Sequence, residues 1–276
     1  MPEVRVSDID IHYEVTDYVA PWRERETVLL HHGFGRNMEF WRAWVPLLAR
    51  RYRVVRVDAR GCGRSGVPAP GEPYTLDQLV AYALGVMDHL EIDRVHWGAE
   101  ASGGHVGLAL ALAHPSRVSS LTLCNTPFKL PKSANDNFSE AEVAQHGLGL
   151  WARRTLPNRI DLDKVTPEWC EWSIAAHDRA PRHIAIAQHA MIAQGDLLPR
   201  LKEVGAPVLV MAGRKSSIAP AEQMIEMQRQ IPHAKLVLFE GYGQGIAFSA
   251  PERCVQEMLA FIDGLRGAAA SASGAK

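Results

Sequence analysis

Residues 94–115 constrain the fold of this 276-residue chain more than any other stretch. A short apolar run, Val95-His96-Trp97, breaks into small residues and the glycine pair Gly103-Gly104. An Ala/Leu-rich segment then continues as far as His114-Pro115. This pattern predicts a strand, a tight turn and a helix, with the helix N-terminus pointing at whatever lies beyond the turn.

The residue at the tip of this turn depends on the register. Enzymes that use such a turn, the nucleophile elbow, place a reactive side chain at the tip and small residues around it. Counting G-x-S-x-G forward from Gly98 puts Glu100 at the tip, whereas counting back from the glycine pair puts Ala101 there and Ser102 after it. We favour the second register because it keeps both glycines where the helix packs closely on the strand. Alanine offers no nucleophile.

Composition limits the class of protein. The length and the 47% hydrophobic content suffice for one large domain with an insertion. A net charge of −1 favours neither nucleic acid nor an anionic membrane as a partner. The N-terminus lacks an apolar signal core, and no apolar run approaches the roughly 18 residues of a membrane span. Scattered cysteines without metal-ligand spacing indicate a reducing compartment. We therefore expect a cytoplasmic protein without metal or cofactor.

Strand and helix patterns alternate along most of the chain. Residues 4–15 alternate apolar and polar side chains, which predicts half-buried antiparallel strands. Continuous apolar runs predict buried strands at 27–31, 53–58, 95–100, 118–124, 207–213 and 235–239. Helical spacing predicts helices at 40–49, 75–90, 106–114, 220–230 and 251–265. The order favours a mostly parallel, twisted sheet flanked by helices.

The alternation stops in one long segment. Residues 128–198 contain no strand-like run, only helical segments rich in Trp and His. We interpret them as a helical cap over the strand ends, inserted into a core formed by residues 1–127 and 199–266. The Gly/Ala/Ser-rich tail, residues 267–276, is expected to be disordered.

Several separated segments together resemble the α/β-hydrolase fold superfamily, in particular its 3-oxoadipate enol-lactonase-like group. They are HGFG at 32–35, DARGCGRS at 58–65, the turn after residue 98, residues 207–220 and GYGQG at 241–245. The resemblance covers about residues 10–265. It implies an α/β-hydrolase fold whose pocket holds a serine nucleophile, a histidine base and an acidic partner.

The positions that match these catalytic roles carry other residues. Ala101 stands where the serine is expected, Gln244 where the histidine is expected, and Ser216 near the position of the acid, which in this fold can also follow another strand. In a serine hydrolase, loss of the nucleophile or base alone removes about six orders of magnitude of rate. The resemblance also assigns two oxyanion donors, the backbone N–H groups of Phe34 and Ser102, and these do not depend on side chains.

Further pocket candidates are His31, His32, Glu100 and Trp151. Each has a structural alternative: His32 orders the loop that carries Phe34, Glu100 bonds to neighbouring loops, and Trp151 packs within the cap. The remaining cap histidines are interpreted in the same way, as ligand contacts or as packing residues. They are His177, His183 and His189.

The sequence leaves several functions open. The leading hypothesis is a repurposed enzyme that binds a small carbonyl compound and performs lyase, isomerase or cyclase chemistry through a retained oxyanion hole. The alternatives are a non-catalytic ligand-binding pseudoenzyme, a slow hydrolase that uses direct water attack, and a hydrolase inactivated by engineering. The substrate and the oligomeric state are not specified by the sequence.

Overall fold

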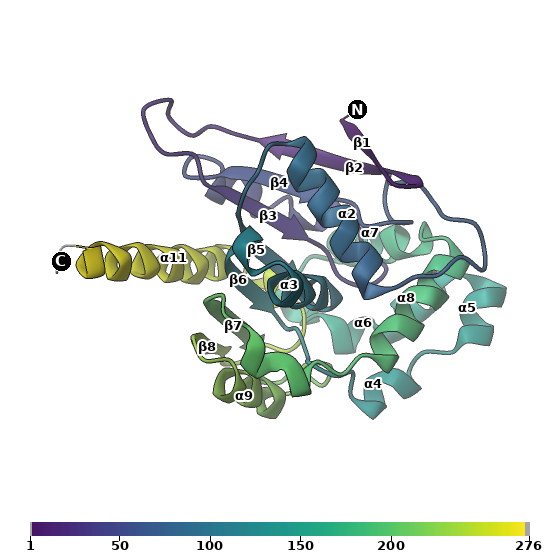
Figure 1. Ribbon diagram of the computed structural model, residues 1–276. Coiled ribbons are helices and arrows are strands. Elements are labelled where there is room, and N and C mark those ends of the chain that lie inside the picture. Colours follow the sequence, from purple (N-terminus) through teal and green to yellow (C-terminus); the bar gives the residue numbers. More distant parts are fainter. Residues whose placement is uncertain (1, 274–276) are drawn as a thin grey trace.

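The computed structural model describes residues 2–273 and contains one eight-stranded sheet (Figure 1). The strand order is β1-β2-β4-β3-β5-β6-β7-β8. All neighbours from β4 to β8 are parallel, while β2 is antiparallel to both β1 and β4. This confirms the predicted mostly parallel sheet. The strands are β1 Glu3–Val6, β2 Ile9–Thr16, β3 Thr27–His31, β4 Arg53–Val57, β5 Val95–Glu100, β6 Val118–Cys124, β7 Val208–Gly213 and β8 Ala234–Phe239.

Helices cover both faces of the sheet, and each face has its own apolar core. On one face pack α2 (Leu76–His89), α3 (Ser102–Ala113) and α9 (Ala221–Gln230). On the other face pack α1 (Val45–Leu48), α10 (Ile246–Ser249) and α11 (Pro251–Ser273). Every residue of β3 and β5 is buried, as expected of strands covered on both sides. Short 3-10 helices occur at η1 Met38–Trp41, η2 Pro115–Arg117, η3 Leu162–Lys164 and η4 Leu198–Glu203.

The segment after β3 differs from the prediction. A single helix was expected over residues 40–49, but the structure has the 3-10 helix η1, a break, and the short helix α1. Pro46, in the first turn of α1, has no N–H to continue a helix from the preceding turn. The indole of Trp44, two residues before Pro46, donates to the carbonyl of Ala247 at 2.8 Å. The proline accounts for the helix boundary, and the indole contact anchors the segment against α10.

The C-terminal helix is longer than expected. Disorder was predicted from residue 267, but α11 continues to Ser273 and extends away from the body of the molecule (Figure 1). Its last turns are rich in alanine, the residue with the highest helix propensity. The remaining part of the predicted tail, residues 274–276, lies outside the described residues.

The segment between β6 and β7 is helical, as expected. Its helices are α4 Lys132–Asp136, α5 Glu140–His146, α6 Leu148–Arg159, α7 Pro167–Asp178 and α8 Arg182–Gln194. Lys129 and Asp196 form a bridge at its base, with a 3.0 Å contact between Nζ and Oδ2. The helices lie together on the side of the sheet opposite the projecting α11 (Figure 1). The division of the chain into core and cap stays a prediction.

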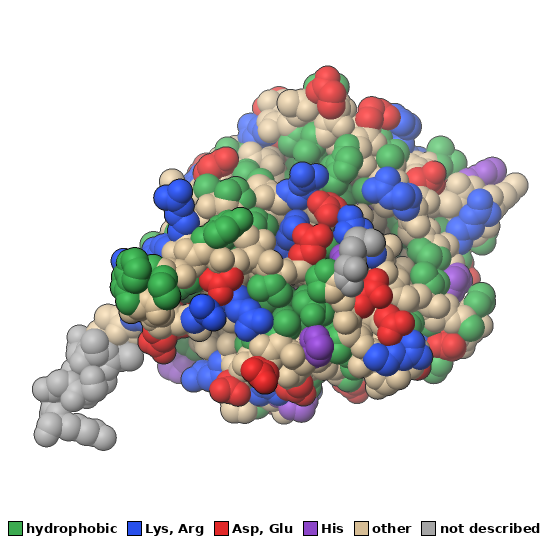
Figure 2. Space-filling view, turned by 90° about the horizontal axis from the view of Figure 1, so that it is seen from above, with side chains coloured by type: hydrophobic (Ala, Val, Ile, Leu, Met, Phe, Trp, Pro, Cys, Tyr) green, Lys and Arg blue, Asp and Glu red, His purple; other side chains and the backbone are tan. Residues whose placement is uncertain are grey.

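Acidic and basic side chains are interspersed on the face shown in Figure 2. Among residues 2–273, no helix is long and apolar enough to cross a membrane.

Candidate functional site

Ala101 lies at the tip of the turn between β5 and α3. Its backbone has φ 48° and ψ −120°, a conformation that L-residues rarely adopt. Its N–H donates to the carbonyl of Cys124 at 3.0 Å, and its carbonyl accepts from the N–H of Gly104 at 3.0 Å. Glu100 is the last residue of β5 rather than the tip. The turn therefore has the geometry that presents a side chain to the space beyond the strands, and that side chain is a methyl group.

The glycine pair explains why the sequence folds in this register. A Cβ on Gly103 would lie 2.5 Å from the carbonyl oxygen of His31, and one on Gly104 would lie 2.2 Å from Oγ1 of Thr126. Only glycine permits the start of α3 to approach the neighbouring chain segments this closely.

The loop after β3 lies directly against this turn. A Cβ on Gly33 would be 3.2 Å from Cβ of Ala101 and 2.9 Å from the carbonyl oxygen of Glu100. Among the residues that the structure describes, neither the N–H of Phe34 nor that of Ser102 donates a hydrogen bond. Both residues line a cavity. Two unengaged N–H groups beside a cavity are suited to stabilising negative charge that develops on a carbonyl oxygen.

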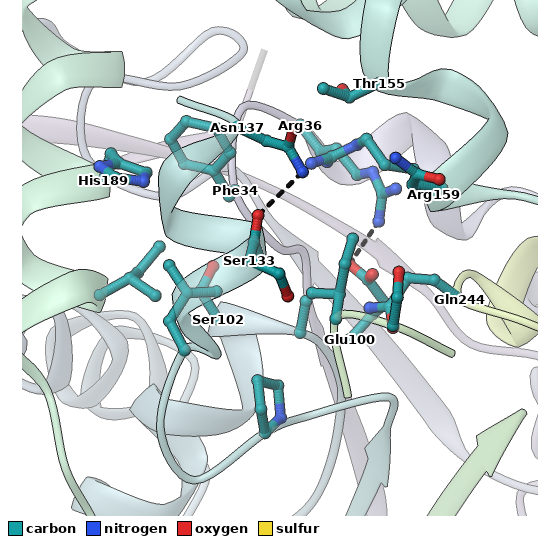
Figure 3. A pocket seen from close by; sticks show the side chains of 18 of the residues that line it. Phe34, Arg36, Glu100, Ser102, Ser133, Asn137, Thr155, Arg159, His189 and Gln244 are labelled. Carbon is teal, nitrogen blue, oxygen red and sulfur yellow. Dashed lines mark hydrogen bonds and ion pairs between the residues drawn. The ribbon is translucent and has the colours of Figure 1, made fainter. Parts of the chain in front are cut away.

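The cavity has a volume of about 320 Å³ and lies between the strand ends and the helical insertion (Figure 3). Its walls are largely apolar, with a few polar and charged groups. Of the residues singled out in the sequence, it brings together Phe34, Glu100, Ala101, Ser102, Trp151, His189 and Gln244. Its other lining residues include Arg36, His105, Leu130, Asn137, Thr155, Arg159, Ile192 and Ile218.

Gln244 and Ser216 satisfy each other. The Ser216 hydroxyl donates to Oε1 of Gln244 at 2.6 Å and accepts from the N–H of Ala219 at 2.9 Å. The Gln244 amide donates to the carbonyl of Asn125 at 3.3 Å. Both side chains are buried, and Ser216 does not line the cavity. The two positions are therefore adjacent, but an amide and a hydroxyl do not take up protons near neutral pH.

Glu100 forms a buried ion pair with Arg36. Nη1 of Arg36 lies 2.5 Å from Oε2 of Glu100, and the side chains are only 3% and 1% exposed. The guanidinium of Arg36 also lies over the rings of Phe40 and Phe248, at 5.2 and 4.6 Å from their centroids. A carboxylate removed from water costs several kcal/mol unless it is paired, and Arg36 provides that pairing. Among the described residues that line the cavity, Glu100 is the only acid.

Arg159, at the end of α6, also lines the cavity. Its guanidinium lies 4.3 Å from the centroid of the Trp151 ring. Burial lowers the pKa of Arg159 to about 9, the positive charge of Arg36 acts in the same direction, and Glu100 opposes both. The side chain therefore stays protonated at neutral pH.

Arg159 was not among the site residues predicted from the sequence. Arg153 and Arg154, which precede it on the same helix, are exposed, so charge alone does not distinguish Arg159 from a surface residue. One signal was present. Trp151, Thr155 and Arg159 are spaced four residues apart, which places them on one face of a helix.

His31 and His32 lie outside the lining of this cavity. The ring of His31 stacks on Trp97 with centroids 5.3 Å apart, and its Nδ1 contacts the carbonyl of His32 at 2.9 Å. His32 accepts at Nε2 from the N–H of Ala59 at 3.0 Å and donates from Nδ1 to the carbonyl of Gly33 at 2.9 Å. Burial lowers the pKa of His31 to about 3 and that of His32 to about 4. Both neutral rings therefore contact the loop after β3, and neither lines the cavity described above.

Three histidines of the helical insertion lie in different surroundings. His189 lines the cavity, where its ring stacks on Phe138 at 3.8 Å and burial lowers its pKa to about 4. Nδ1 of His177 contacts the carbonyl of Ser173 at 2.7 Å, and Nε2 of His183 contacts that of Pro68 at 2.9 Å. Within residues 2–273, no group of three or more His, Cys, Asp or Glu side chains is placed to hold a metal ion.

Comparison with known proteins defines the class. Residues 26–157 match the alpha/beta hydrolase fold family. The crystal structure of a hydrolase from Pseudomonas aeruginosa PA01 is 30% identical, with a TM-score of 0.85 over 95% of this chain and 97% of that chain. Together with the sheet topology, these matches show that the chain belongs to the alpha/beta hydrolase fold family, which confirms the predicted fold.

Two further relatives are similar over nearly their whole length. A RutD protein of Caulobacter segnis, named as a carbamate hydrolase, is 28% identical over 263 residues, which cover 92% of this chain and 97% of the relative. The enol-lactonase from Burkholderia xenovorans LB400 has a TM-score of 0.87 over 95% of this chain and 100% of its own. At 24% identity, the likeness to the enol-lactonase shows a shared fold.

Proposed function

We propose that this protein binds a small carbonyl compound and catalyses a reaction of the lyase, isomerase or cyclase type without a covalent acyl intermediate. The observation that carries the proposal is Ala101. Its backbone keeps the strained geometry of a nucleophile elbow, but its side chain has no atom that attacks a carbonyl. The unengaged N–H groups of Phe34 and Ser102 beside it support stabilisation of an enolate oxygen.

The pair formed by Gln244 and Ser216 supports the same proposal. In a serine hydrolase the histidine takes the nucleophile's proton and the acid orients that histidine. Here the two positions carry an amide and a hydroxyl, joined by a 2.6 Å hydrogen bond. With Ala101, these residues support the interpretation of a degenerate triad, and under this proposal another group transfers the proton.

Glu100 is the group that we assign to proton transfer. It lines the cavity next to Ala101, and its charge is balanced by Arg36, which acts as a positioning residue. In the proposed step, a C–H bond next to the substrate carbonyl breaks, the proton moves to the Glu100 carboxylate, and the electron pair moves to the carbonyl oxygen as an enolate. When the substrate carries a β,γ double bond, the enolate is a dienolate, and return of the proton from Glu100 to the γ carbon completes an isomerisation without a co-reactant.

Deuterium exchange tests this assignment directly. We expect the wild-type protein in D₂O to exchange the protons next to the carbonyl of 4-oxopentanoate or its methyl ester faster than buffer, followed by NMR. Glu100→Gln should slow this exchange roughly 10²-fold, because a positioned acid or base contributes about that much. The exposed Glu240→Gln is the matched control and should exchange like wild type.

Glu100→Gln also leaves Arg36 without its partner, so folding must be checked by thermal melting. Glu100→Asp provides the second variant, since it keeps the charge and shifts the carboxylate. Partial exchange in Glu100→Asp supports the assignment. Exchange at the wild-type rate in folded Glu100→Gln contradicts it.

Hydrolysis by direct water attack is the second candidate, because the similar proteins are named as a carbamate hydrolase and an enol-lactonase. In that case the same two N–H groups stabilise a tetrahedral oxyanion formed by water rather than an enolate. Release of acid from esters or lactones, without deuterium exchange into ketones, favours this candidate. Ligand-induced thermal stabilisation with neither reaction favours a non-catalytic binding protein.

A further inference from the structure

We propose that Arg159 binds the carboxylate of the ligand, so that the natural ligand is a small carbonyl compound that also carries a carboxylate on an apolar body. The inference rests on the proposed function, because it concerns the same cavity. It adds the chemical class of the ligand and the residue that recognises it.

The charges around the cavity are not balanced. Arg36 and Arg159 each contribute a positive charge, while Glu100 contributes the single negative charge among the described lining residues. Glu100 is held at 2.5 Å by Arg36. An anion that enters the cavity therefore meets one guanidinium whose charge is still uncompensated.

That guanidinium is Arg159. Within residues 2–273, no carboxylate oxygen lies within 4.0 Å of it. Its polar contact is with Nε2 of His177 at 3.5 Å, which is long for a hydrogen bond. Burial and the nearby arginines lower the pKa of His177 well below its usual value, so this histidine is a neutral neighbour. A charge removed from water without an ionic partner is costly, and a bound carboxylate offsets that cost.

The surroundings of Arg159 fix its position. The guanidinium lies over the indole of Trp151, a contact that orients a planar cation. The backbone beneath it is also confined: a Cβ on Gly245 would lie 2.6 Å from the carbonyl oxygen of Arg159. Asp161 accepts from the N–H of Gly243 at 2.8 Å, which ties the same segment to the loop that carries Gln244. A held guanidinium is suited to bidentate binding of a carboxylate.

The rest of the cavity favours an apolar, flat ligand body. Phe34 and Trp151 pack edge to face with ring centroids 5.2 Å apart, and Leu130, Ile192 and Ile218 complete the apolar walls. Figure 3 shows Arg159 and Glu100 on one side of the cavity, and Phe34 and His189 on the other. At about 320 Å³, the space is near the lower limit of small-molecule sites, which restricts the ligand to a small compound.

The test compares an acid with its neutral ester. We would measure binding of 4-oxo-4-phenylbutanoate and of its methyl ester by calorimetry. The wild-type protein should bind the acid at least about tenfold more tightly, in line with the strength of a charge-assisted hydrogen-bonded pair. Arg159→Met should bind the two compounds within about threefold of each other. Arg153→Met, on the same helix but exposed, is the matched control and should keep the wild-type preference.

Equal affinity of the wild-type protein for acid and ester overturns the inference, as does an acid preference that survives in Arg159→Met. Arg159→Gln serves as a second variant, and a thermal melt of each variant establishes that it is folded. Inorganic phosphate is the competing anion: displacement of the acid by phosphate at equal concentration would show a general anion site and overturn the carboxylate assignment.

Binding and turnover separate this inference from the proposed function. Selective binding of the acid without deuterium exchange supports the role of Arg159 and contradicts the proposed catalysis. Exchange into neutral ketones without an acid preference supports the proposed catalysis and contradicts the role of Arg159.

Discussion

The backbone conformation of Ala101 is set by the chain segments that pack around it. A non-glycine residue at φ 48° and ψ −120° carries strain on the order of 1–3 kcal/mol. In an active serine hydrolase that strain presents a nucleophile, but here it presents a methyl group. The close contacts of Gly33, Gly103 and Gly104 maintain the conformation whatever side chain stands at the tip.

Replacing Ala101 by glycine should stabilise the fold. Glycine removes the steric cost of the positive φ, and its larger entropy in the unfolded state offsets part of the gain. We expect a rise of about 1 kcal/mol in the free energy of unfolding, measured by urea denaturation. Ala101→Val should lower it, because a β-branched side chain is more strained there. A less stable Ala101→Gly protein would show that the turn is not strained.

Rebuilding the triad should create an esterase. Ser216 and Gln244 already lie within hydrogen-bond distance, so Ser216→Asp and Gln244→His would place an acid beside a base. Combined with Ala101→Ser, they should hydrolyse p-nitrophenyl acetate roughly 10²-fold faster than wild type, well below the six orders of magnitude of a mature triad. The same pair of changes with Ala101 retained is the control and should show no gain. Activity equal in both would mean that the added serine is not the nucleophile.

The sequence predicts the position of a residue best where neighbouring residues constrain the backbone. Ala101 was located from the glycine pair, because the packing of α3 decides the register. Arg159 was missed, and the alternatives for His31 could not be separated, for a common reason. Whether a side chain on a helix or strand end meets a cavity or the core depends on contacts with distant segments, such as Gly245 beneath Arg159 and Trp97 beside His31.

At the scale of elements, the turn depends on how closely α3 packs against the segment that follows β6. Gly104→Ala should destabilise the protein by about 1–3 kcal/mol, because the new Cβ would lie 2.2 Å from Oγ1 of Thr126. Gly264→Ala is the matched control, since Gly264 lies on α11 with nothing within 4 Å of an added Cβ. That change should stabilise by about 0.5–1 kcal/mol. Urea denaturation of both proteins measures the contrast, and similar effects would contradict the packing argument.

Elements defined by strong periodicity were predicted closely, and those defined by long-range contacts were not. The strand predicted at 118–124 matches the structure because its apolar run is a local signal. The helix after Thr75 matches because the capping residue lies next to the helix that it begins. The segment between η1 and α1 is anchored by the Trp44 indole, whose partner is the carbonyl of Ala247 far along the chain. Pro46 is a local signal for a helix boundary, but the partner of the Trp44 indole cannot be read from the neighbouring residues.

At the scale of the whole molecule, buried neutral histidines predict loss of stability in mild acid. Burial lowers the pKa of His31 to about 3 and those of His32 and His96 to about 4, against 6.5 when unfolded. Between these values the unfolded chain binds more protons, so the free energy of unfolding falls as the pH falls below about 6.5. Each histidine should contribute a loss on the order of 1–2 kcal/mol between pH 7 and about pH 5.

Urea denaturation at pH 7, 6 and 5 measures this dependence. His96→Gln should reduce the slope, because an amide keeps a polar partner for Ser120 without taking up a proton. The exposed His114→Gln should leave the slope unchanged. Stability that is constant over this range would contradict the assignment of neutral buried histidines.

The central claim is that the cavity acts without a covalent bond between protein and substrate. Intact-protein mass spectrometry after incubation with a fluorophosphonate and with activated esters tests it most directly. The account predicts an unmodified mass for the wild-type protein and a single adduct for the variant that carries Ala101→Ser, Ser216→Asp and Gln244→His. A stoichiometric adduct on the wild-type protein, mapped to a serine that lines the cavity such as Ser102, would contradict it.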